Sequence, residues 1–334
     1  MSKYPIFSVM GIEIEYMLVD STDLCVQPKS DVLLKALAGE MVNETILGDI
    51  AISNELVMHV LELKNNGPKT PTAPIAQHFQ EAIMALQPLL HEHHLMLLPT
   101  AAHPFMNPQT QTKRWPHGNM DIYALYDRIF NCQGHGWSNL QSMHVNLPFL
   151  GDDEFSTLHN NIRLLLPLLP ALAASSPILD GAPTGMLDTR LSFYDKNQAS
   201  IPSISGDIIP EAIHSKAEYE STILTPMYEA IRPFDPEHIL QEEWLNSRAA
   251  IPKFEYGAIE IRIIDSQECV NADIAIAHLI HAILKHWTTQ QPSEGRSYEL
   301  STRSLKAIYD KTLHTGLDVL IQDVAFLKAC ELPP

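Results

Sequence analysis

The segment Gly11-Ile12-Glu13-Ile14-Glu15-Tyr16 decides how we interpret the rest of the chain. Its apolar residues alternate with two acids, and this period of two predicts a β-strand with one face in a core. Glu13 and Glu15 would share the other face about 7 Å apart, because each strand residue rises about 3.3 Å. A strand whose polar face lies in water has the same pattern, so the segment alone leaves both interpretations open.

A second acidic strand is predicted near the other end of the chain, at Ile259-Glu260-Ile261-Arg262-Ile263. Here Glu260 and Arg262 share a face. Our hypothesis is that the two strands lie in one sheet and line one site for metal and phosphate. Carboxylates suit divalent cations, and the arginine fork suits phosphate oxygens.

Composition limits the partners of the chain. Its 334 residues allow one elaborated domain or two ordinary ones, and 45% hydrophobic residues indicate a globular protein. The net charge of -18 argues against a nucleic-acid partner, since phosphate binding needs a basic surface. No membrane span is expected, because the longest apolar run, Leu164–Ala174, is too short and contains two prolines.

The cysteines indicate a reducing compartment. Cys25, Cys132, Cys269 and Cys330 are far apart and form no C-x-x-C pair, so we predict free thiols. Acids at positions 13 and 15 interrupt the apolar N-terminal run, which argues against a signal peptide. We therefore expect a cytoplasmic protein.

Further elements follow from hydrophobic periodicity and from the residues that end helices. Strands are predicted at 46–52, 53–63, 95–99 and 142–147. Helices are predicted at 31–38, 74–94, 120–130, 153–174, 211–231, 271–287 and 298–330. The helix at 271–287 places His278 and His281 on a solvated outer face, and the tail at 298–330 could contribute to a homodimer.

The positions of Glu55 and Glu62 pose a question of register. They are seven residues apart, which puts them on opposite faces of one flat strand. If both serve the site, Glu55 lies in the loop before the strand or a bulge intervenes. On a helix the same spacing would place both on one face, and the sequence leaves this alternative open.

Two other segments could carry function. Asn107–Gly118 is a polar loop that could act as a lid. His91, His93 and His94 end a predicted helix and could bind the metal of a hydrolase. Histidines in a last helical turn also suit the helix dipole, which is the simpler explanation.

The candidate metal ligands are acids and one histidine: Glu13, Glu15, Glu55, Glu62, His144 and Glu260. Oxygen ligands suit magnesium or manganese, and one histidine is compatible with either ion. Two carboxylates about 4 Å apart repel by about 4 kcal/mol at an effective dielectric near 20. If these acids converge, either some are protonated or cations lie between them.

Three arginines complement the acids, namely Arg190, Arg248 and Arg262. Guanidinium groups hold phosphate or carboxylate oxygens bidentately. We find neither a Walker-type glycine loop nor a G-x-S-x-G elbow. A nucleotide-dependent enzyme with this sequence would therefore hold its phosphates through metals and arginines.

The ordered set of motifs resembles the second, carboxylate–amine ligase branch of the glutamate–cysteine ligase family. The motifs that carry this resemblance are Gly11–Tyr16, Glu55–Leu63, Met143–Asn146, Ser175–Pro177 with Thr184, Gly185 and Arg190, Pro202–Gly206, and Ile259–Asp265. Each motif is short, but together they span residues 11–265 in the order of the family. Residues beyond 265 are matched by helical character alone.

The resemblance implies an α+β fold like that of glutamine synthetase, with an antiparallel sheet that forms an open funnel and helices packed on its outer face. Residues 1–334 would form a single ligase domain with a helical part at 271–334. ATP, with Mg²⁺ or Mn²⁺, would phosphorylate a small-molecule carboxylate. An amine would then attack the acyl phosphate to give an amide.

Carried over residue by residue, the resemblance makes all six candidates above metal ligands. Glu260 and Arg262 would be catalytic, Arg262 and Arg248 would bind ATP at the transferring phosphoryl group, and Arg190 would bind the substrate carboxylate. The loop Ser192–Ala199 departs from the family pattern, and the chain is short for the family. The amine and the carboxylate therefore stay open, as does a binding protein that keeps fold and metals without catalysis.

Overall fold

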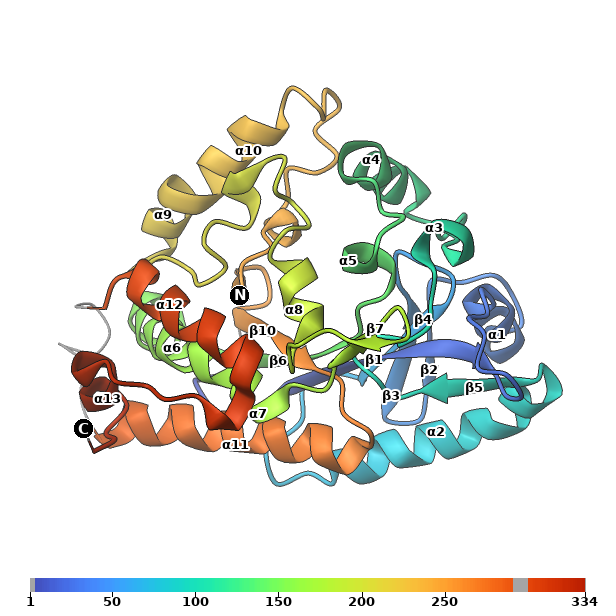
Figure 1. Cartoon of the computed structure of the whole chain (residues 1–334), viewed down its shortest axis with the longest axis horizontal. Coiled ribbons are helices and arrows are strands. Elements are labelled where there is room, and N and C mark those ends of the chain that lie inside the picture. Colours follow the sequence, from blue (N-terminus) through green and yellow to red (C-terminus); the bar gives the residue numbers. More distant parts are fainter. Residues whose placement is uncertain (1–3, 291–299, 334) are drawn as a thin grey trace.

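A central antiparallel sheet organises the protein. The computed structural model describes residues 4–290 and 300–333. The main sheet has the strand order β2-β3-β4-β1-β6-β10-β9, and β5 also pairs with β1 (Figure 1). Its strands are β1 Gly11–Asp20, β2 Glu44–Leu47, β3 Ile50–Asn54, β4 Val60–Asn65, β5 Leu95–Leu98, β6 Ser142–Pro148, β9 Ala250–Lys253 and β10 Ala258–Asp265. A separate hairpin joins β7 Ile178–Leu179 to β8 Ala182–Pro183.

Helices and helical turns supply the rest of the fold, so the predicted α+β class is confirmed. The α-helices are α1 Ser30–Ala38, α2 Ile75–Glu92, α3 Pro108–Gln111, α4 Met120–Phe130, α5 His135–Ser138, α6 Gly151–Leu165, α7 Leu169–Ala173, α8 Thr189–Tyr194, α9 Lys216–Tyr219, α10 Thr225–Ile231, α11 Val270–Gln290, α12 Thr302–Thr315 and α13 Val324–Ala329. Shorter turns are η1 Leu166–Leu168, η2 Pro202–Ile204, η3 Glu220–Leu224, η4 Glu243–Leu245 and η5 Gly316–Asp318. None of the described helices is both long and apolar enough to cross a membrane.

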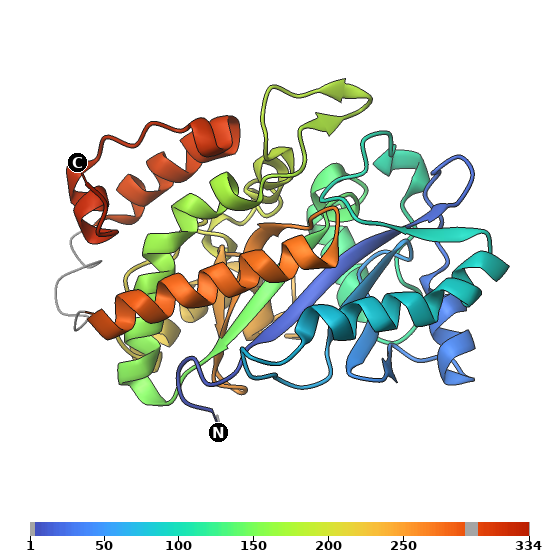
Figure 2. The same cartoon turned by 90° about the horizontal axis from the view of Figure 1, so that it is seen from below.

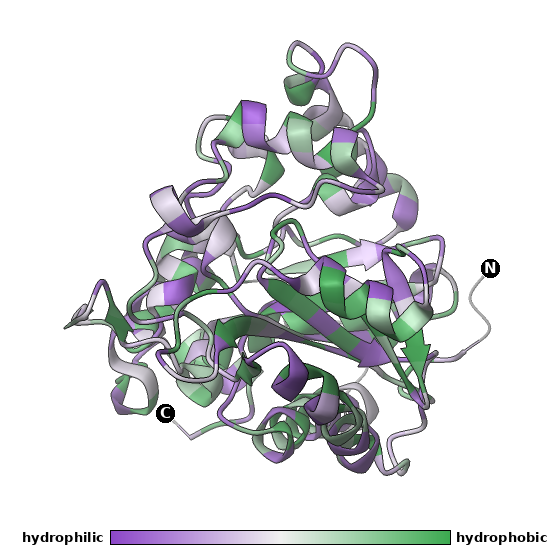
Figure 3. Cartoon of the chain, turned by 90° about the vertical axis from the view of Figure 1, so that its right-hand side faces the viewer, coloured by the Kyte–Doolittle hydropathy of each residue, from purple (hydrophilic) through white to green (hydrophobic). Residues whose placement is uncertain are grey.

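The two faces of β1 have opposite environments, as its alternation predicts. Ile12, Ile14 and Tyr16 are at most 3% exposed and belong to the main hydrophobic core. Helices α2 and α11 lie along this apolar face (Figures 1 and 2). Hydrophilic residues are interspersed with hydrophobic ones along the strands in Figure 3. Glu13 and Glu15 therefore face the side of the sheet that these two helices leave open.

The predicted strands at 46–52 and 53–63 are wrong in their boundaries. The first is a hairpin of β2 and β3, because Gly48 has a φ of +65° and permits a tight turn there. The second breaks after Asn54, and β4 begins only at Val60. Glu55 therefore lies in a loop before the strand, which was one of the two solutions to the register problem.

The predicted helix at 211–231 begins only at Lys216. Glu211 is irregular because its carboxylate pairs with Arg248, whose Nε lies 2.7 Å from Glu211 Oε2. The kink expected at Pro226 is instead a π-helical turn, η3, just before it. Pro226 then sits in the first turn of α10, where a missing N–H breaks no helical bond.

The predicted solvated position of His281 is also wrong, whereas the lid at Asn107–Gly118 stays a prediction. His281 is only 7% exposed, because the N-terminal segment crosses α11 and brings the Phe7 carbonyl to 3.3 Å from His281 Nε2. Trp115, in the predicted lid, is fully buried, and its backbone N–H donates to the Leu56 carbonyl at 2.9 Å. This part of the loop is thus attached to the segment after β3.

The tail is helical, as predicted, in α12 and α13; residues 298 and 299 of that prediction lie outside the described part of the chain. Leu305 and Tyr309 of α12 are buried in the main core. The tail is therefore packed into the body of the protein.

We predict that Ile14→Ala lowers the free energy of unfolding by about 2–5 kcal/mol, because it leaves a cavity at a fully buried strand position. Ile46→Ala, the same substitution at a position that is 61% exposed on β2, should change it by less than about 1 kcal/mol. Denaturant unfolding followed by circular dichroism measures both. Equal effects would contradict the placement of β1 in the core.

His159 should make the fold sensitive to acid. The residue is fully buried in α6, and burial lowers its pKa to about 4. In the unfolded chain its pKa is near 6.5, so between pH 6.5 and 4 only the unfolded state takes up the proton. Stability should fall by up to about 3 kcal/mol from this group as the pH drops through that window.

We expect His159→Gln, which can still donate to the Glu211 carbonyl that His159 Nε2 contacts at 2.9 Å, to reduce that loss. His91→Gln, at an exposed position, is the matched control and should leave the slope unchanged. Denaturant unfolding between pH 4 and 7.5 measures the slope, and identical slopes for wild type and His159→Gln would contradict the prediction.

Candidate active site

The open face of the sheet carries a continuous set of charged and polar side chains. Strand pairing places Glu13 of β1 between Lys64 and His144, and Glu15 opposite Glu62. Glu260 of β10 lies opposite Asn146 of β6. Because side chains alternate along strands, these residues share one face, which we call the polar face. Its members are Glu13, Glu15, Glu62, Lys64, Ser142, His144, Asn146, Lys253, Glu260 and Arg262.

Three potential metal ligands converge near the middle of this face. One ligand atom each from Glu13, His144 and Glu260 lies within 4.8 Å of the others. His144 Nδ1 is 3.1 Å from Glu13 and 4.0 Å from Glu260, and its other ring nitrogen is 2.9 Å from the Ser142 hydroxyl. That second contact orients the imidazole, as outer contacts of metal-binding histidines do. Two carboxylates and one imidazole fit a divalent cation such as Mn²⁺ or Mg²⁺.

Among residues 4–290 and 300–333, this is the one group of three acids, histidines or cysteines that meets so closely. His91, His93 and His94 do not converge in this way, so the hydrolase hypothesis has no geometric support. The sequence alone could not decide this, because adjacent residues at a helix end point in different directions.

The other three predicted acids form a neighbouring group. Glu15 accepts hydrogen bonds from the Ser142 N–H and hydroxyl, at 2.6 and 3.0 Å, and Glu62 accepts one from Ser53 at 2.8 Å. Burial, and then the charge of Glu13, raises the pKa of Glu62 to about 7. Burial and the charges of Glu62 and Glu15 raise the pKa of Glu55 well above its usual range. A cation among these carboxylates would relieve the repulsion.

Two lysines of the polar face were missed by the sequence analysis. Lys64 Nζ lies 3.1 Å from Glu62 and 2.9 Å from Glu44, while Lys253 pairs with Glu260. A hydrogen bond from His144 and the charge of Lys253 hold the pKa of Glu13 below its usual range, against the effect of burial. Residues two apart on a strand share a face, so the position of Lys64, two residues after Glu62, could have placed it on the polar face. No pattern in the sequence indicates that Lys253 faces Glu260, because their contact depends on the pairing of β9 with β10.

A cavity of about 430 Å³ opens on one side of the converging ligands, and we call it the first cavity. Glu15, Glu55 and His144 line it together with Arg190 and Arg262. Much of its remaining wall is aromatic, with Tyr123, Tyr126, Trp137, Tyr194 and Trp244, and further polar and aliphatic residues complete the lining. The first cavity is thus lined by acidic, arginine and apolar side chains together.

A second cavity, also of about 430 Å³, opens on the other side. Glu13 and Asn146 line it, as do Lys64 and Lys253. Its other walls are largely apolar and include Tyr4, Met10, Ile12, Pro148 and Tyr256. Since Glu13 lines one cavity and His144 lines the other, the converging ligands lie between the two.

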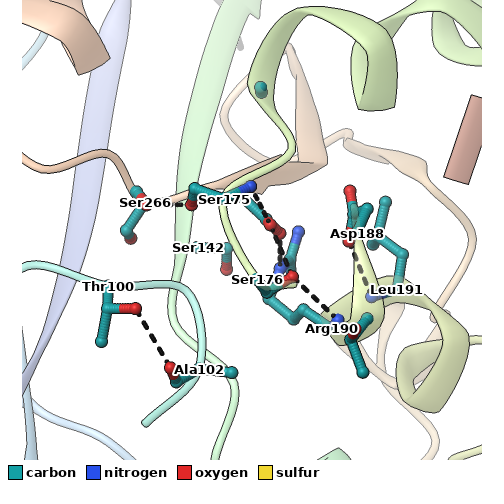
Figure 4. A network of polar contacts seen from close by, with 12 residues as sticks. Thr100, Ala102, Ser142, Ser175, Ser176, Asp188, Arg190, Leu191 and Ser266 are labelled. Atoms are coloured by element: carbon teal, nitrogen blue, oxygen red, sulfur yellow. Dashed lines mark hydrogen bonds and ion pairs between the residues drawn. The ribbon is translucent and has the colours of Figure 1, made fainter. Parts of the chain in front are cut away.

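Arg190 is held rigidly at the first cavity (Figure 4). It is 2% exposed, and its Nε donates to Asp265 Oδ1 at 2.5 Å. The other Asp265 oxygen accepts hydrogen bonds from the Ser175 N–H and the Ser176 hydroxyl, at 2.9 and 2.8 Å. Nη2 of Arg190 is buried and has no hydrogen-bond partner among the described residues. A donor held in this way suits an anionic group in the cavity.

A bulge in β10 explains how Asp265 reaches Arg190. Glu260 and Asp265 are five residues apart, so a regular strand would place them on opposite faces. The register between β10 and β6 shifts between Ile261 and Ile264, which inserts one residue and brings Asp265 opposite Ser142 on the polar face.

The two remaining arginines differ in their surroundings. Arg262 lines the first cavity, with its Nε 3.0 Å from Glu260 and its Nη1 donating to the Asn246 carbonyl at 3.1 Å. Arg248 lines neither cavity. Its guanidinium donates to both Glu211 oxygens at 2.7 and 2.8 Å, so we leave it out of the phosphate contacts proposed below.

The chain is similar in sequence to known proteins over most of its length. The family model described as glutamate-cysteine ligase family 2 matches residues 9–319. An uncharacterized Archaeoglobus fulgidus protein is 40% identical over 277 residues, which cover 83% of this chain and 74% of that protein. A Bradyrhizobium protein provisionally named glutamate–cysteine ligase 2 is 25% identical over 287 residues, and the match spans 61% of its length, less than two thirds.

A solved structure shares the fold. The bifunctional glutathione synthetase from Pasteurella multocida superimposes with a TM-score of 0.59 at 12% identity, covering 98% of this chain and 46% of that chain. At this identity the likeness concerns the fold alone.

We predict that Mn²⁺ binds to the polar face and that Glu260→Gln weakens this binding at least tenfold, because it removes one charged ligand. Glu44→Gln is the matched control, since Glu44 contacts Lys64 at the edge of the sheet and none of the three converging ligand atoms. Calorimetric titration with Mn²⁺ measures both. Equal affinity for wild type and Glu260→Gln would remove Glu260 from the metal site.

Proposed function

This chain belongs to glutamate-cysteine ligase family 2, and from that premise we propose that it is an ATP-dependent carboxylate–amine ligase. The observation that carries the proposal is the position of the converging ligands between two cavities, one with two lysines and one with two arginines. Phosphoryl transfer requires an aligned donor and acceptor, and neutralised charge between them. The polar face offers both.

The second cavity is our proposed ATP site. Lys64 and Lys253 provide ammonium groups for phosphate oxygens, and the apolar walls suit a nucleobase. A nucleotide placed here would direct its terminal phosphate towards Glu13 and Glu260. Arg262, held by Glu260 and the Asn246 carbonyl, is our candidate for the group that contacts the transferring phosphoryl.

The first cavity is our proposed site for the carboxylate and the amine. Nη2 of Arg190 could donate to a substrate carboxylate, and the buried Tyr194 hydroxyl on the same wall also has no hydrogen-bond partner within residues 4–290 and 300–333. The identity of the amine stays open, because the aromatic side chains of the first cavity could pack against apolar groups of several shapes. Cysteine and other amino acids are the first candidates by family.

The proposed reaction has two steps. A carboxylate oxygen attacks the terminal phosphorus of ATP, a P–O bond of ATP breaks, and an acyl phosphate forms as ADP leaves. The amine nitrogen then attacks the acyl carbon, phosphate leaves, and the nitrogen loses a proton. Mg²⁺ or Mn²⁺, held by Glu13, His144 and Glu260 and by the group of Glu15, Glu55 and Glu62, would neutralise phosphate charge. Arg190 and Arg262 orient the reactants.

Several finer points belong to the same proposal. We infer an open funnel like that of glutamine synthetase, a single ligase domain over residues 1–334 with a helical part at 271–334, and a cytoplasmic location. All four cysteines are free thiols, which suits a reducing compartment. A homodimer stays a prediction.

The alternative is a binding protein that kept the fold and the metal ligands without catalysis. Its support is the loop Ser192–Ala199, which departs from the family pattern and supplies Tyr194, Asn197 and Gln198 to the first cavity. Tight binding of nucleotide or amino acid without turnover would favour this alternative.

We predict that the protein, with ATP, Mg²⁺ and pools of amino acids, releases phosphate in an amino-acid-dependent way. Hydroxylamine in place of the amine should trap the acyl phosphate as a hydroxamate, which detects the first step even when the amine is unknown. Glu260→Gln should lower the rate at least a hundredfold, since removing one such electrostatic group typically has an effect of about this size.

Glu44→Gln should stay within about twofold of wild type, and circular dichroism should show that both variants are folded. No amino-acid-dependent phosphate and no hydroxamate with any carboxylate would contradict the ligase proposal. An active Glu260→Gln variant would remove that residue from the catalytic site.

A further inference from the structure

Helix α8 carries two residues of the first cavity yet is too short to hold them by itself. Arg190 and Tyr194 are four residues apart, so they lie on the same side of the helix, and both line the cavity. The helix has six residues, and an isolated helix of this length is not stable in water. Its position must therefore come from its neighbours.

One neighbour, α12, holds the beginning of α8. The N–H groups of Leu187 and Asp188 both donate to the Leu313 carbonyl of α12, at 3.1 Å each. Asp188 in turn caps α8 by accepting the Leu191 N–H at 3.0 Å. The segment before α8 approaches the end of α12 closely at Gly316, where an added Cβ would lie 2.7 Å from Leu187 Cδ1. No bulkier residue fits there without displacing Leu187.

The same helix holds the end of α8. Asp195, the residue after α8, accepts hydrogen bonds from the Tyr309 hydroxyl at 2.9 Å and from Lys306 Nζ at 3.1 Å. Tyr309 and Lys306 are three residues apart and lie on one side of α12. Tyr309 is fully buried and the Asp195 side chain is 13% exposed, so water competes little for these bonds.

Helix α12 is itself fixed to the body of the protein. Thr312 is fully buried, and its hydroxyl donates to the Pro167 carbonyl of η1 at 2.8 Å. Leu305 and Leu313 belong to the main core. The helix therefore joins the core to both ends of α8, which Figure 1 places between α7 and the upper helices.

We propose that α12 is a positioning element of the substrate site, in which Tyr309 and Lys306 act through Asp195 to hold Arg190 and Tyr194 at the first cavity. Its effect on substrate binding rests on the function proposed above, whereas the support of α8 by α12 does not. The tail would thereby affect the carboxylate substrate more than ATP, because the second cavity contains no residue of α8.

Tyr309→Phe tests this proposal, since it removes the hydroxyl and keeps the ring. We expect the KM of the carboxylate substrate to rise roughly fivefold, the size of one lost hydrogen bond. The KM of ATP should stay within about twofold. Thr288→Val is the control: it also removes a hydroxyl, but one on α11 that accepts a hydrogen bond from the Asn161 amide of α6 at 2.9 Å.

Two further variants separate positioning from a general loss of stability. Asp195→Asn keeps an acceptor for Tyr309 and should have a smaller effect on KM than Asp195→Ala. Adding Tyr309→Phe to Asp195→Ala should change KM no further, because the contact is already absent. Equal KM changes in Tyr309→Phe and Thr288→Val, or additive effects in the double variant, would overturn the proposal.

Hydrogen exchange provides a test that needs no turnover. Amides of residues 187–198 should exchange faster in Tyr309→Phe than in wild type or Thr288→Val. If the wild type has no ligase activity, this readout still decides the proposed support of α8. Unchanged exchange over 187–198 in Tyr309→Phe would overturn it whatever the protein catalyses.

Discussion

Repulsion between carboxylates on one side of a single strand is the constraint on which the structure depends. Glu13 and Glu15 project from β1, and strand pairing brings Glu62 and Glu260 to the same face. Partly buried acids this close destabilise a fold unless positive charge lies among them. The chain supplies part of that charge through His144, Lys64 and Lys253. The remaining negative charge favours a cation at this face.

The other face of the same strand makes this arrangement possible. Ile12 and Ile14 are buried against a core that extends over α2, α6 and α11, and this apolar burial stabilises the sheet. Because side chains alternate along a strand, β1 can bury apolar residues on one face and present acids on the other. The converging ligands Glu13, His144 and Glu260 therefore lie on strands that the core supports. Glu55, Arg190 and the aromatic side chains of the first cavity reach the site from outside the sheet.

The sequence predicted the strands of the site well, because period two depends only on local spacing. It identified β1, β6 and β10, and it gave the correct condition for Glu55, namely a loop before the strand. It failed where distant segments meet. Neither the contact of His281 with Phe7 nor the pairing of Arg248 with Glu211 leaves a periodic signal. Lys253 was missed for the same reason, since its role depends on which strand lies beside β10.

Strand β10 shows how one irregularity links the two halves of the site. Glu260 lies among the converging ligands, while Asp265, at the end of the strand, fixes Arg190 at the first cavity. Without the extra residue between Ile261 and Ile264, Asp265 would point into the core and Arg190 would lose its partner. The bulge thus lets one strand both carry Glu260 and fix Arg190. Their separation is set by backbone geometry, and not by flexible side chains.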